Sequence, residues 1–184
     1  MLKKKAQNEE GIIVFEDEAS FRQNPTLHQT WAPIGRQPKV ATKGQRNTQK
    51  IFGAIDLYSG KFTYLHQEKY FTYETYILFL NNILRQFYKK NHRVFLIQDN
   101  ASYHKKSETY DWFKKNRNYI EVTNLPPYYP EYNAIERIWN YTRKDATHNK
   151  YFETEQDLCN SLYTTFEDIK KHPKKIMSLL HPFF

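Results

Sequence analysis

The sequence has little cysteine and glycine and no long hydrophobic run, with one Cys and five Gly among its 184 residues. A single cysteine, Cys159, excludes an internal disulfide and any zinc site built from cysteine ligands. No signal peptide is expected, because residues 1–10 are polar and no apolar segment follows them, and no stretch is long and apolar enough to span a membrane. We therefore expect no membrane partner and a reducing cytoplasm as the compartment.

Aromatic side chains, by contrast, are abundant: 15 Tyr and 13 Phe bring the aromatic share to 17% and help to bring the hydrophobic share to 39%. With so few glycines, this content is typical of a compact α/β or α+β domain and not of a disordered chain. At this length we expect one domain, which buries roughly two-thirds of the surface that its unfolded chain exposes. Residues 1–10 are expected to be a flexible lead or linker remnant, residues 11–171 the domain, and residues 172–184 a C-terminal tail.

Positive charge is in excess, because basic residues outnumber acidic ones by 28 to 20 and the pI is about 9.3. The basic residues gather between the apolar runs, where loops and exposed helix faces are expected. These clusters lie at residues 3–5, 43–50, 89–93, 105–106, 114–117 and 170–175. Clustered positive charge favours a nucleic-acid partner and predicts salt-sensitive DNA binding. The alternative is a basic protein without such a partner.

Hydrophobic periodicity predicts the order strand, hairpin, helix, strand, helix, strand, helix, helix. The elements are a strand at 11–15 that runs into acids at 16–18, hairpin strands at 50–56 and 61–66, strands at 94–98 and 119–123, and helices at 72–90, 107–116, 130–146 and 154–171. Residues 21–38 are expected to form a loop, and Trp31 and Trp139 are interpreted as core residues. This order describes an α/β fold, the ribonuclease-H-like mixed sheet with helices on both faces.

Two aspartates stand where predicted strands end. Asp99 follows an apolar run, so it lies at the carboxyl end of a strand, where open α/β sheets place their sites. Strand alternation puts Asp17 on one face and its neighbours Glu16 and Glu18 on the other. The local alternatives are a turn or helix cap for Asp99 and an exposed, charged strand end for Asp17.

A third acid, Glu136, lies on a predicted helix beside an apolar stripe. The stripe consists of Ile135, Ile138, Trp139 and Thr142. At the edge of this stripe, Glu136 can reach over a neighbouring strand end, whereas the ordinary alternative for a helical glutamate is a solvated face.

Three carboxylates that converge from separate elements suit metal-dependent phosphoryl transfer. Two Mg²⁺ ions roughly 3.5–4 Å apart activate the attacking oxygen and stabilise the leaving oxygen, and hard cations prefer carboxylate oxygens and water. We therefore predict that Asp17, Asp99 and Glu136 hold two Mg²⁺ (or Mn²⁺) ions.

Three sequence blocks carry a family resemblance. They are Phe15-Glu16-Asp17-Glu18 with Trp31, Gly35 and Pro38 downstream, Gln98-Asp99-Asn100-Ala101 with His104-Lys105, and Leu125-Pro126-Pro127-Tyr128 with Pro130-Glu131, Asn133, Ile135-Glu136-Arg137 and Trp139. This pattern resembles the mariner-superfamily DDE transposases, most closely their bacterial insertion-sequence branch. The resemblance covers about residues 11–150, its last block is the most specific, and the 36 residues between Asp99 and Glu136 are close to the spacing typical of that branch.

The resemblance implies a ribonuclease-H-like fold, a catalytic triad of Asp17, Asp99 and Glu136, and divalent-metal-dependent DNA cleavage and strand transfer. In this family, water frees a transposon 3′-OH, which then attacks target DNA, usually at a TA dinucleotide. The implied partners are transposon ends and target DNA. A homodimer is expected because two ends must be held together, and the expected place of action is the bacterial cytoplasm, at the nucleoid.

Further residues of these blocks carry weaker expectations. Candidates for DNA contact are Asn100, His104, Lys105 and Arg137. Asn100 steers Asp99 by hydrogen bonding or shapes the turn after it, while His104 and Lys105 contact a phosphate or are ordinary surface residues.

Two positions depart from the family pattern. Tyr129 stands where serine is common, which removes a helix-capping hydroxyl, and Ala134 stands where proline is common. Neither is a ligand, so these departures concern the geometry of the helix that carries Glu136 and not the chemistry.

Members of this family recognise their ends with helix-turn-helix modules, and the residues before Gly11 leave no room for one. The chain is therefore expected to be part of a split or frameshifted transposase, a truncated copy, or a product whose coding start lies upstream. A separate helix-turn-helix segment is expected as a further partner. Two other functions stay open: a nuclease of the same fold that cuts without strand transfer, and a non-catalytic DNA-binding or assembly module.

Overall fold

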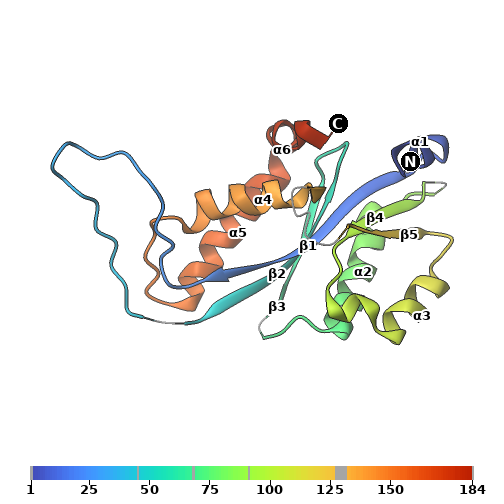
Figure 1. Cartoon of the computed structure of the whole chain (residues 1–184), viewed down its shortest axis with the longest axis horizontal. Helices are drawn as coiled ribbons and strands as arrows, with labels where there is room; N and C mark the ends of the chain where they lie inside the picture. Colours follow the sequence, from blue (N-terminus) through green and yellow to red (C-terminus); the bar gives the residue numbers. More distant parts are fainter. Residues whose placement is uncertain (1, 45, 68, 91, 127–131, 184) are drawn as a thin grey trace.

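A five-stranded mixed sheet forms the centre of the computed structural model, which describes residues 2–44, 46–67, 69–90, 92–126 and 132–183 (Figure 1). The strands are β1 (Ile12–Arg22), β2 (Thr48–Asp56), β3 (Phe62–Gln67), β4 (Val94–Gln98) and β5 (Ile120–Asn124). Their order across the sheet is β3-β2-β1-β4-β5. β1, β2 and β3 pair antiparallel, whereas β4 is parallel to both β1 and β5. The mixed sheet expected from the order of the elements is confirmed.

Helices cover both faces of this sheet. Helices α2 (Tyr73–Phe87) and α3 (Ser107–Lys115) lie on one face; α4 (Ile135–Thr142), α5 (Glu155–Lys171) and α6 (Pro173–Leu180) lie on the other. Each face has its own hydrophobic core. Because side chains alternate along β1, Val14 packs in the core beneath α2 while Ile13 and Phe15 pack in the core beneath α4 and α5. Short helical segments complete the chain: α1 (Leu2–Asn8), η1 (Ser102–Lys105), the π-helix η3 (Arg143–Thr147) and η4 (His181–Phe183).

Local chemistry accounts for several of these boundaries. Thr72 and Thr154 cap α2 and α5 by accepting a hydrogen bond from the backbone N–H three residues later, and each takes part in a reciprocal capping box. Gly60 adopts φ +68° in the turn between β2 and β3, a conformation that glycine enters without steric cost. The expected hairpin and the expected Thr72 cap are both confirmed.

Both ends of the chain are more ordered than the sequence suggests. Residues 2–8 form α1, where Ala6 is buried and the Lys5 Nζ lies 2.6 Å from Glu121 of β5. Within the expected lead, one small apolar contact and an ion pair thus hold this helix to the sheet. At the other end α6 buries Ile176 and Leu180 in the core shared with α4 and α5, so residues 173–180 are part of the packed structure.

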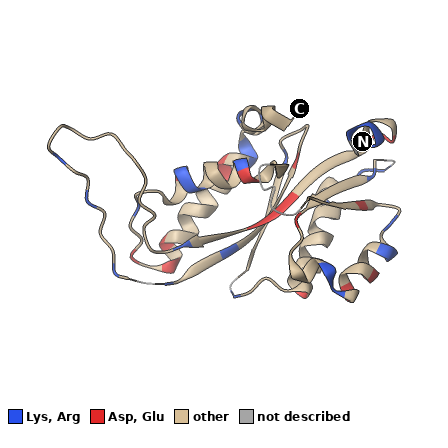
Figure 2. Ribbon diagram, viewed as in Figure 1, with Lys and Arg blue, Asp and Glu red and all other residues tan. Residues whose placement is uncertain are grey.

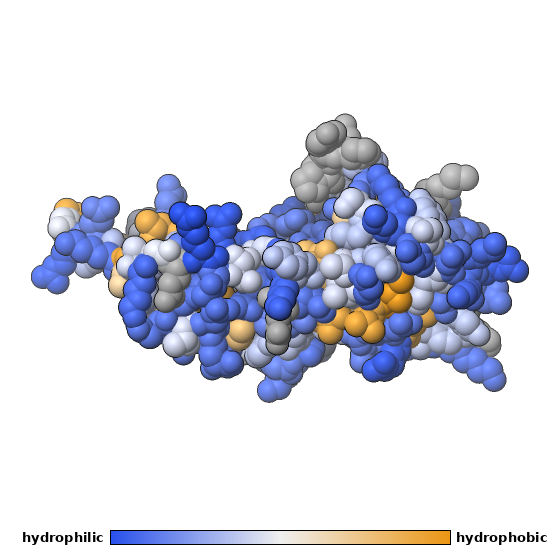
Figure 3. All heavy atoms as spheres, turned by 90° about the horizontal axis from the view of Figure 1, so that it is seen from below, coloured by the Kyte–Doolittle hydropathy of each residue, from blue (hydrophilic) through white to orange (hydrophobic). Residues whose placement is uncertain are grey.

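A long arm, defined here as residues 23–47, connects β1 to β2 and projects beyond the end of the sheet (Figure 1). Its aromatic residue Trp31 and its Ile34 are fully exposed, at 101% and 105% of their reference surface. The interpretation of Trp31 as a core residue is wrong, because the arm carries it away from both cores. Trp139, in contrast, is fully buried as expected. Figure 3 shows a few hydrophobic atoms on an otherwise hydrophilic arm, at the left.

Among the described residues, no helix has the length and the apolar character needed to cross a membrane.

Candidate active site

Asp17 and Asp99 lie side by side where β4 ends; the first strand does not end at its acids as expected, but continues past Asp17 to Arg22. In the β1–β4 ladder, Phe15 pairs with Ile97. Asp17 and Asp99 come two residues further along each chain and therefore share a face of the sheet. Asp17 is still inside β1, where it pairs with Gly53 of β2, and Asp99 directly follows β4. The strand register thus brings these two predicted ligands together.

Glu18 joins the two aspartates, which strand alternation did not indicate. Asp17, Glu18 and Asp99 each offer a carboxylate oxygen within 4.8 Å of the others, and Figure 2 shows this acidic segment as the red middle of β1. The β1–β4 pairing stops at Phe15, and Glu18, although it alternates with Asp17 along β1, brings a carboxylate oxygen within reach of both aspartates. The only signal in the sequence was that an acid, Glu18, stands next to Asp17.

The electrostatics of this group favour a bound cation. Burial is the main cause that raises the pKa of Asp17 to about 8, and the carboxylates of Glu18, Glu136 and Asp99 add to the shift in that order. Within the described part of the chain, neither a lysine nor an arginine forms an ion pair with Asp17, Glu18 or Asp99. Carboxylates crowded in this way are stabilised when a cation compensates their charge.

Glu136 stands in the first turn of α4, partly buried at the edge of the site. Its carboxylate lies 4.0 Å from the Arg143 Nη1 and close enough to Asp17 to raise the pKa of that aspartate. Among the described residues, Glu136 is not one of the acids that meet within 4.8 Å. The structure therefore places Glu136 beside the two aspartates but further away than Glu18.

Two hydrogen bonds hold the start of α4 over β1. The Asn133 Nδ2 donates to the Glu16 carbonyl at 3.2 Å, and the indole Nε1 of Trp139 donates to the Asp17 Oδ2 at 3.2 Å. At Ala134, where proline is common in the family, φ is −61°, the value that proline would impose. Alanine at this position therefore has the backbone φ that a proline would have. Tyr129, the other departure, lies outside the described residues.

Gly53 makes room for the indole of Trp139. A Cβ atom built at Gly53 would lie 2.3 Å from the Cη2 and 2.6 Å from the Cζ2 of that ring. We expect Gly53→Ala to lower the free energy of unfolding by about 1–3 kcal/mol, because a rigid buried ring must move, and to weaken the contact between Trp139 and Asp17. Urea unfolding followed by tryptophan fluorescence measures both effects. Unchanged stability and fluorescence would contradict this account of Gly53.

The four candidates for DNA contact have different surroundings. The Asn100 Nδ2 donates to the Leu125 carbonyl at 2.6 Å, which ties the ends of β4 and β5 together. Lys105 and Arg137 are exposed. The side chain of His104 is only 1% exposed, because the short helix η1 turns its ring inward against Asp99.

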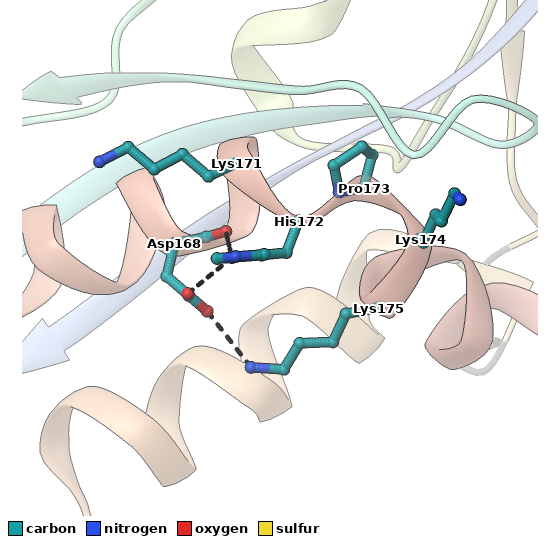
Figure 4. A pocket seen from close by; sticks show the side chains of 6 residues that line it. All are labelled: Asp168, Lys171, His172, Pro173, Lys174 and Lys175. Carbon is teal, nitrogen blue, oxygen red and sulfur yellow. Dashed lines mark hydrogen bonds and ion pairs between the residues drawn. The ribbon is translucent and has the colours of Figure 1, made fainter.

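A pocket elsewhere on the surface is separate from the acidic group. It lies at the junction of α5 and α6 and is lined by Asp168, Lys171, His172, Pro173, Lys174 and Lys175 (Figure 4). The Asp168 carboxylate lies 2.8 Å from the His172 Nδ1 and 3.2 Å from the Lys175 Nζ. Asp17, Glu18 and Asp99 do not line this pocket. We therefore do not place the reaction there.

Comparison with known proteins decides the family. Residues 12–159 match the family described as DDE superfamily endonuclease. The chain belongs to this family. The family resemblance that the three sequence blocks carried is thereby confirmed.

Individual relatives extend this result. The DDE chain is 27% identical over 173 residues to the "Insertion element IS630 uncharacterized 39 kDa protein" of Shigella sonnei, covering 93% of this chain and 46% of that protein. The structure resembles a pre-cleavage Mos1 transpososome (TM-score 0.65, 15% identity, 97% of this chain and 58% of that chain) and the catalytic domain of Mos1 mariner transposase (TM-score 0.56, 13% identity, 97% and 88%). The chain thus spans about half the length of the curated relative and nearly all of the isolated Mos1 catalytic domain's fold.

Proposed function

We propose that the chain is the catalytic domain of a mariner/IS630-type DDE transposase, which cleaves DNA strands and transfers them to a target during cut-and-paste transposition. The observation that carries this proposal is the meeting of Asp17 and Asp99 on adjacent parallel strands, with Glu136 beside them. The family supports a phosphoryl-transfer site at this place, because carboxylates from separate rigid elements can hold catalytic cations in a fixed geometry.

The residues present fit a divalent metal. The donor set consists of hard carboxylate oxygens, and the raised pKa of Asp17 indicates negative charge that the protein alone does not compensate. We assign Asp17, Asp99 and Glu136 as ligands of two Mg²⁺ (or Mn²⁺) ions, with Glu18 close enough to contribute. When bound, such ions lower the pKa of the attacking water or hydroxyl and stabilise the leaving oxygen.

The protein's own part in the reaction is to fix the orientation of these carboxylates. The Asp99 Oδ1 accepts a hydrogen bond from the Ala101 N–H at 2.8 Å, which sets the direction of the second oxygen. Asp17 is held by the Trp139 N–H at 3.2 Å. Positioning of this kind converts a slow encounter into a prearranged reaction.

The arm supplies a surface for the DNA backbone. Between Glu18 and Asp56 the sequence has no acidic residue, and the arm carries Arg36, Lys39, Lys43 and Arg46; Figure 2 shows blue segments along the arm. Such clustering attracts phosphates and makes binding depend on salt. We propose that this arm, with the exposed Lys105 and Arg137, contacts DNA close to the acidic site.

The assembly in which the domain acts is also part of the proposal. One similar structure is described as a Mos1 transposase paired-end complex with left transposon end. We infer that two copies of this chain hold two transposon ends. A separate helix-turn-helix segment recognises the ends, and the target is TA.

A strand-transfer assay tests the proposal. A pre-cleaved donor oligonucleotide with a free 3′-OH is incubated with supercoiled plasmid and Mg²⁺, and joined products are counted and sequenced. We expect joining, inefficient for this chain alone and with little preference for the donor sequence. Nicking of the plasmid without joined donor would indicate a nuclease of the same fold, and neither product would indicate a non-catalytic module.

A further inference from the structure

A second group of potential ligands lies on the face of β1 opposite Asp17. Strand alternation points Glu16 and Glu18 to this face, and η1 places His104 against them. The two glutamates each offer a carboxylate oxygen, and His104 a ring nitrogen, with all three atoms within 4.8 Å of one another. Glu16 is fully buried and His104 is 4% exposed, so these are interior groups and not a solvated acidic surface.

Glu16 has no partner that explains its burial. In the described part of the chain, neither of its carboxylate oxygens has a hydrogen-bond partner. The phenol of Tyr103 donates to the Glu18 Oε1, and the phenol of Tyr76, which also lines this region, donates to Gln98 instead of Glu16. A buried, charged carboxylate without a partner costs several kcal/mol; burial raises the pKa of Glu16 well above its usual range, and either a proton or a bound cation neutralises it.

The hydrogen bonds of His104 point in the same direction. Its Nδ1 lies 3.3 Å from the carbonyl oxygen and 3.3 Å from the Oδ1 of Asp99. Both of these atoms accept hydrogen bonds, so Nδ1 carries the proton. The Nε2 then directs its lone pair at the Glu18 Oε1, 3.3 Å away, and it has no hydrogen-bond partner among the described residues.

The His104 Nε2 and the Glu18 Oε1 thus face each other across a gap of 3.3 Å that an electrophile can occupy, either a metal ion or a proton. Histidines that bind metals commonly donate their other ring N–H to a carboxylate or a backbone carbonyl, which fixes the tautomer. His104 and Asp99 have this arrangement.

We propose that Glu16, Glu18 and His104 bind one divalent transition-metal ion of the zinc class, on the face of β1 opposite Asp17, at a site that shares Glu18 with the group of Asp17 and Asp99. Two carboxylate oxygens and one imidazole nitrogen are ligands that Zn²⁺ accepts, with a fourth position left for water. The imidazole disfavours Mg²⁺, which prefers an all-oxygen shell. Two carboxylates neutralise the charge of the ion, and through His104 the ion holds Asp99 in place.

Metal uptake tests this site independently of the proposed function. The assay uses the variant Asp17→Asn/Glu136→Gln, which lacks two of the proposed Mg²⁺ ligands, after removal of metals with a chelator. Co²⁺ serves as the spectroscopic probe, and Zn²⁺ is measured by equilibrium dialysis. We expect about one equivalent of Co²⁺ with visible absorption bands, displaced by Zn²⁺ but not by Mg²⁺.

Adding Glu16→Gln to this background is expected to weaken Co²⁺ binding at least tenfold, as is Glu18→Gln. Glu167→Gln, on the exposed face of α5, is the matched control and should leave binding unchanged. Far-UV circular dichroism confirms that each variant is folded, and Zn²⁺ should raise the melting temperature of the background and not that of its Glu16→Gln derivative. Absence of uptake by the background, or uptake insensitive to Glu16→Gln, would overturn the proposal, because the electrophile would then be a proton.

Discussion

Asp99→Asn is expected to lower Mg²⁺-dependent DNA cleavage and joining by about 10³-fold or more, which corresponds to roughly 4 kcal/mol of transition-state stabilisation. The variant removes a charged ligand from the residue that directly follows β4, beside Asp17 in the middle of β1. It retains an oxygen that can accept the Ala101 N–H, and the Asp99 side chain is 49% exposed, so the fold should persist. The measurement is the rate of joining of a pre-cleaved donor to supercoiled DNA under single-turnover conditions.

Asp111→Asn is the matched control, because Asp111 is an exposed aspartate on α3, away from the acidic group. It should keep full activity, whereas Glu136→Gln should lose as much as Asp99→Asn if α4 supplies the third ligand. Activity that survives Asp99→Asn would rule out the carboxylate site. Activity that survives Glu136→Gln but is lost in Glu18→Gln would instead make Glu18 the third ligand.

Trp139→Ala is expected to have the largest effect on stability, about 3–5 kcal/mol and therefore a fall in melting temperature of roughly 6–20 °C. Trp139 is fully buried and makes edge-to-face contacts with Phe21 and Phe62, at ring-centroid distances of 6.1 and 6.3 Å. Removing the ring opens a cavity between α4 and the sheet beneath the acidic site. Thermal and urea unfolding followed by circular dichroism measure the loss.

Two further variants separate packing from hydrogen bonding. Trp31→Ala makes the same change on the exposed arm and should alter stability by no more than about 0.5 kcal/mol. Trp139→Phe keeps most of the ring but removes the N–H that binds Asp17, so it should cost less stability than Trp139→Ala and still lower activity. A loss below about 1 kcal/mol in Trp139→Ala would show that α4 is not held by this residue.

The sequence predicted the helix cap and the hairpin turn because each is formed by residues that are neighbours in the chain. The Thr72 side chain caps α2 through the backbone of its own first turn, and the glycine turn joins two strands that are neighbours in the chain. Alternation along β1 predicted which residues face each core. In contrast, α1 has one buried residue, Ala6, among charged neighbours, and no periodic pattern indicates a helix that is held by an ion pair to a distant strand.

The sequence predicted only some of the contacts between side chains of different helices and strands. His104 looked like a surface residue in a polar turn, but η1 places its ring between Glu18 and Asp99. Trp31 looked like core because it is large and aromatic; its position is decided by the arm, which projects beyond the end of the sheet and leaves Trp31 fully exposed. The exposed Trp31 and the buried Trp139 show that residue type alone does not determine burial.

By itself, the sequence determined the class of fold, the family and the presence of acids after two apolar runs, because alternation, caps and motif spacing act over short stretches of chain. Only the tertiary structure decided which acids meet. The register of β1 and β4 sets Asp17 beside Asp99, Glu18 brings a carboxylate oxygen within reach of both, and packing of Trp139 over Gly53 places α4 and Glu136. Each of these depends on contacts between residues far apart in the chain, which no local pattern records.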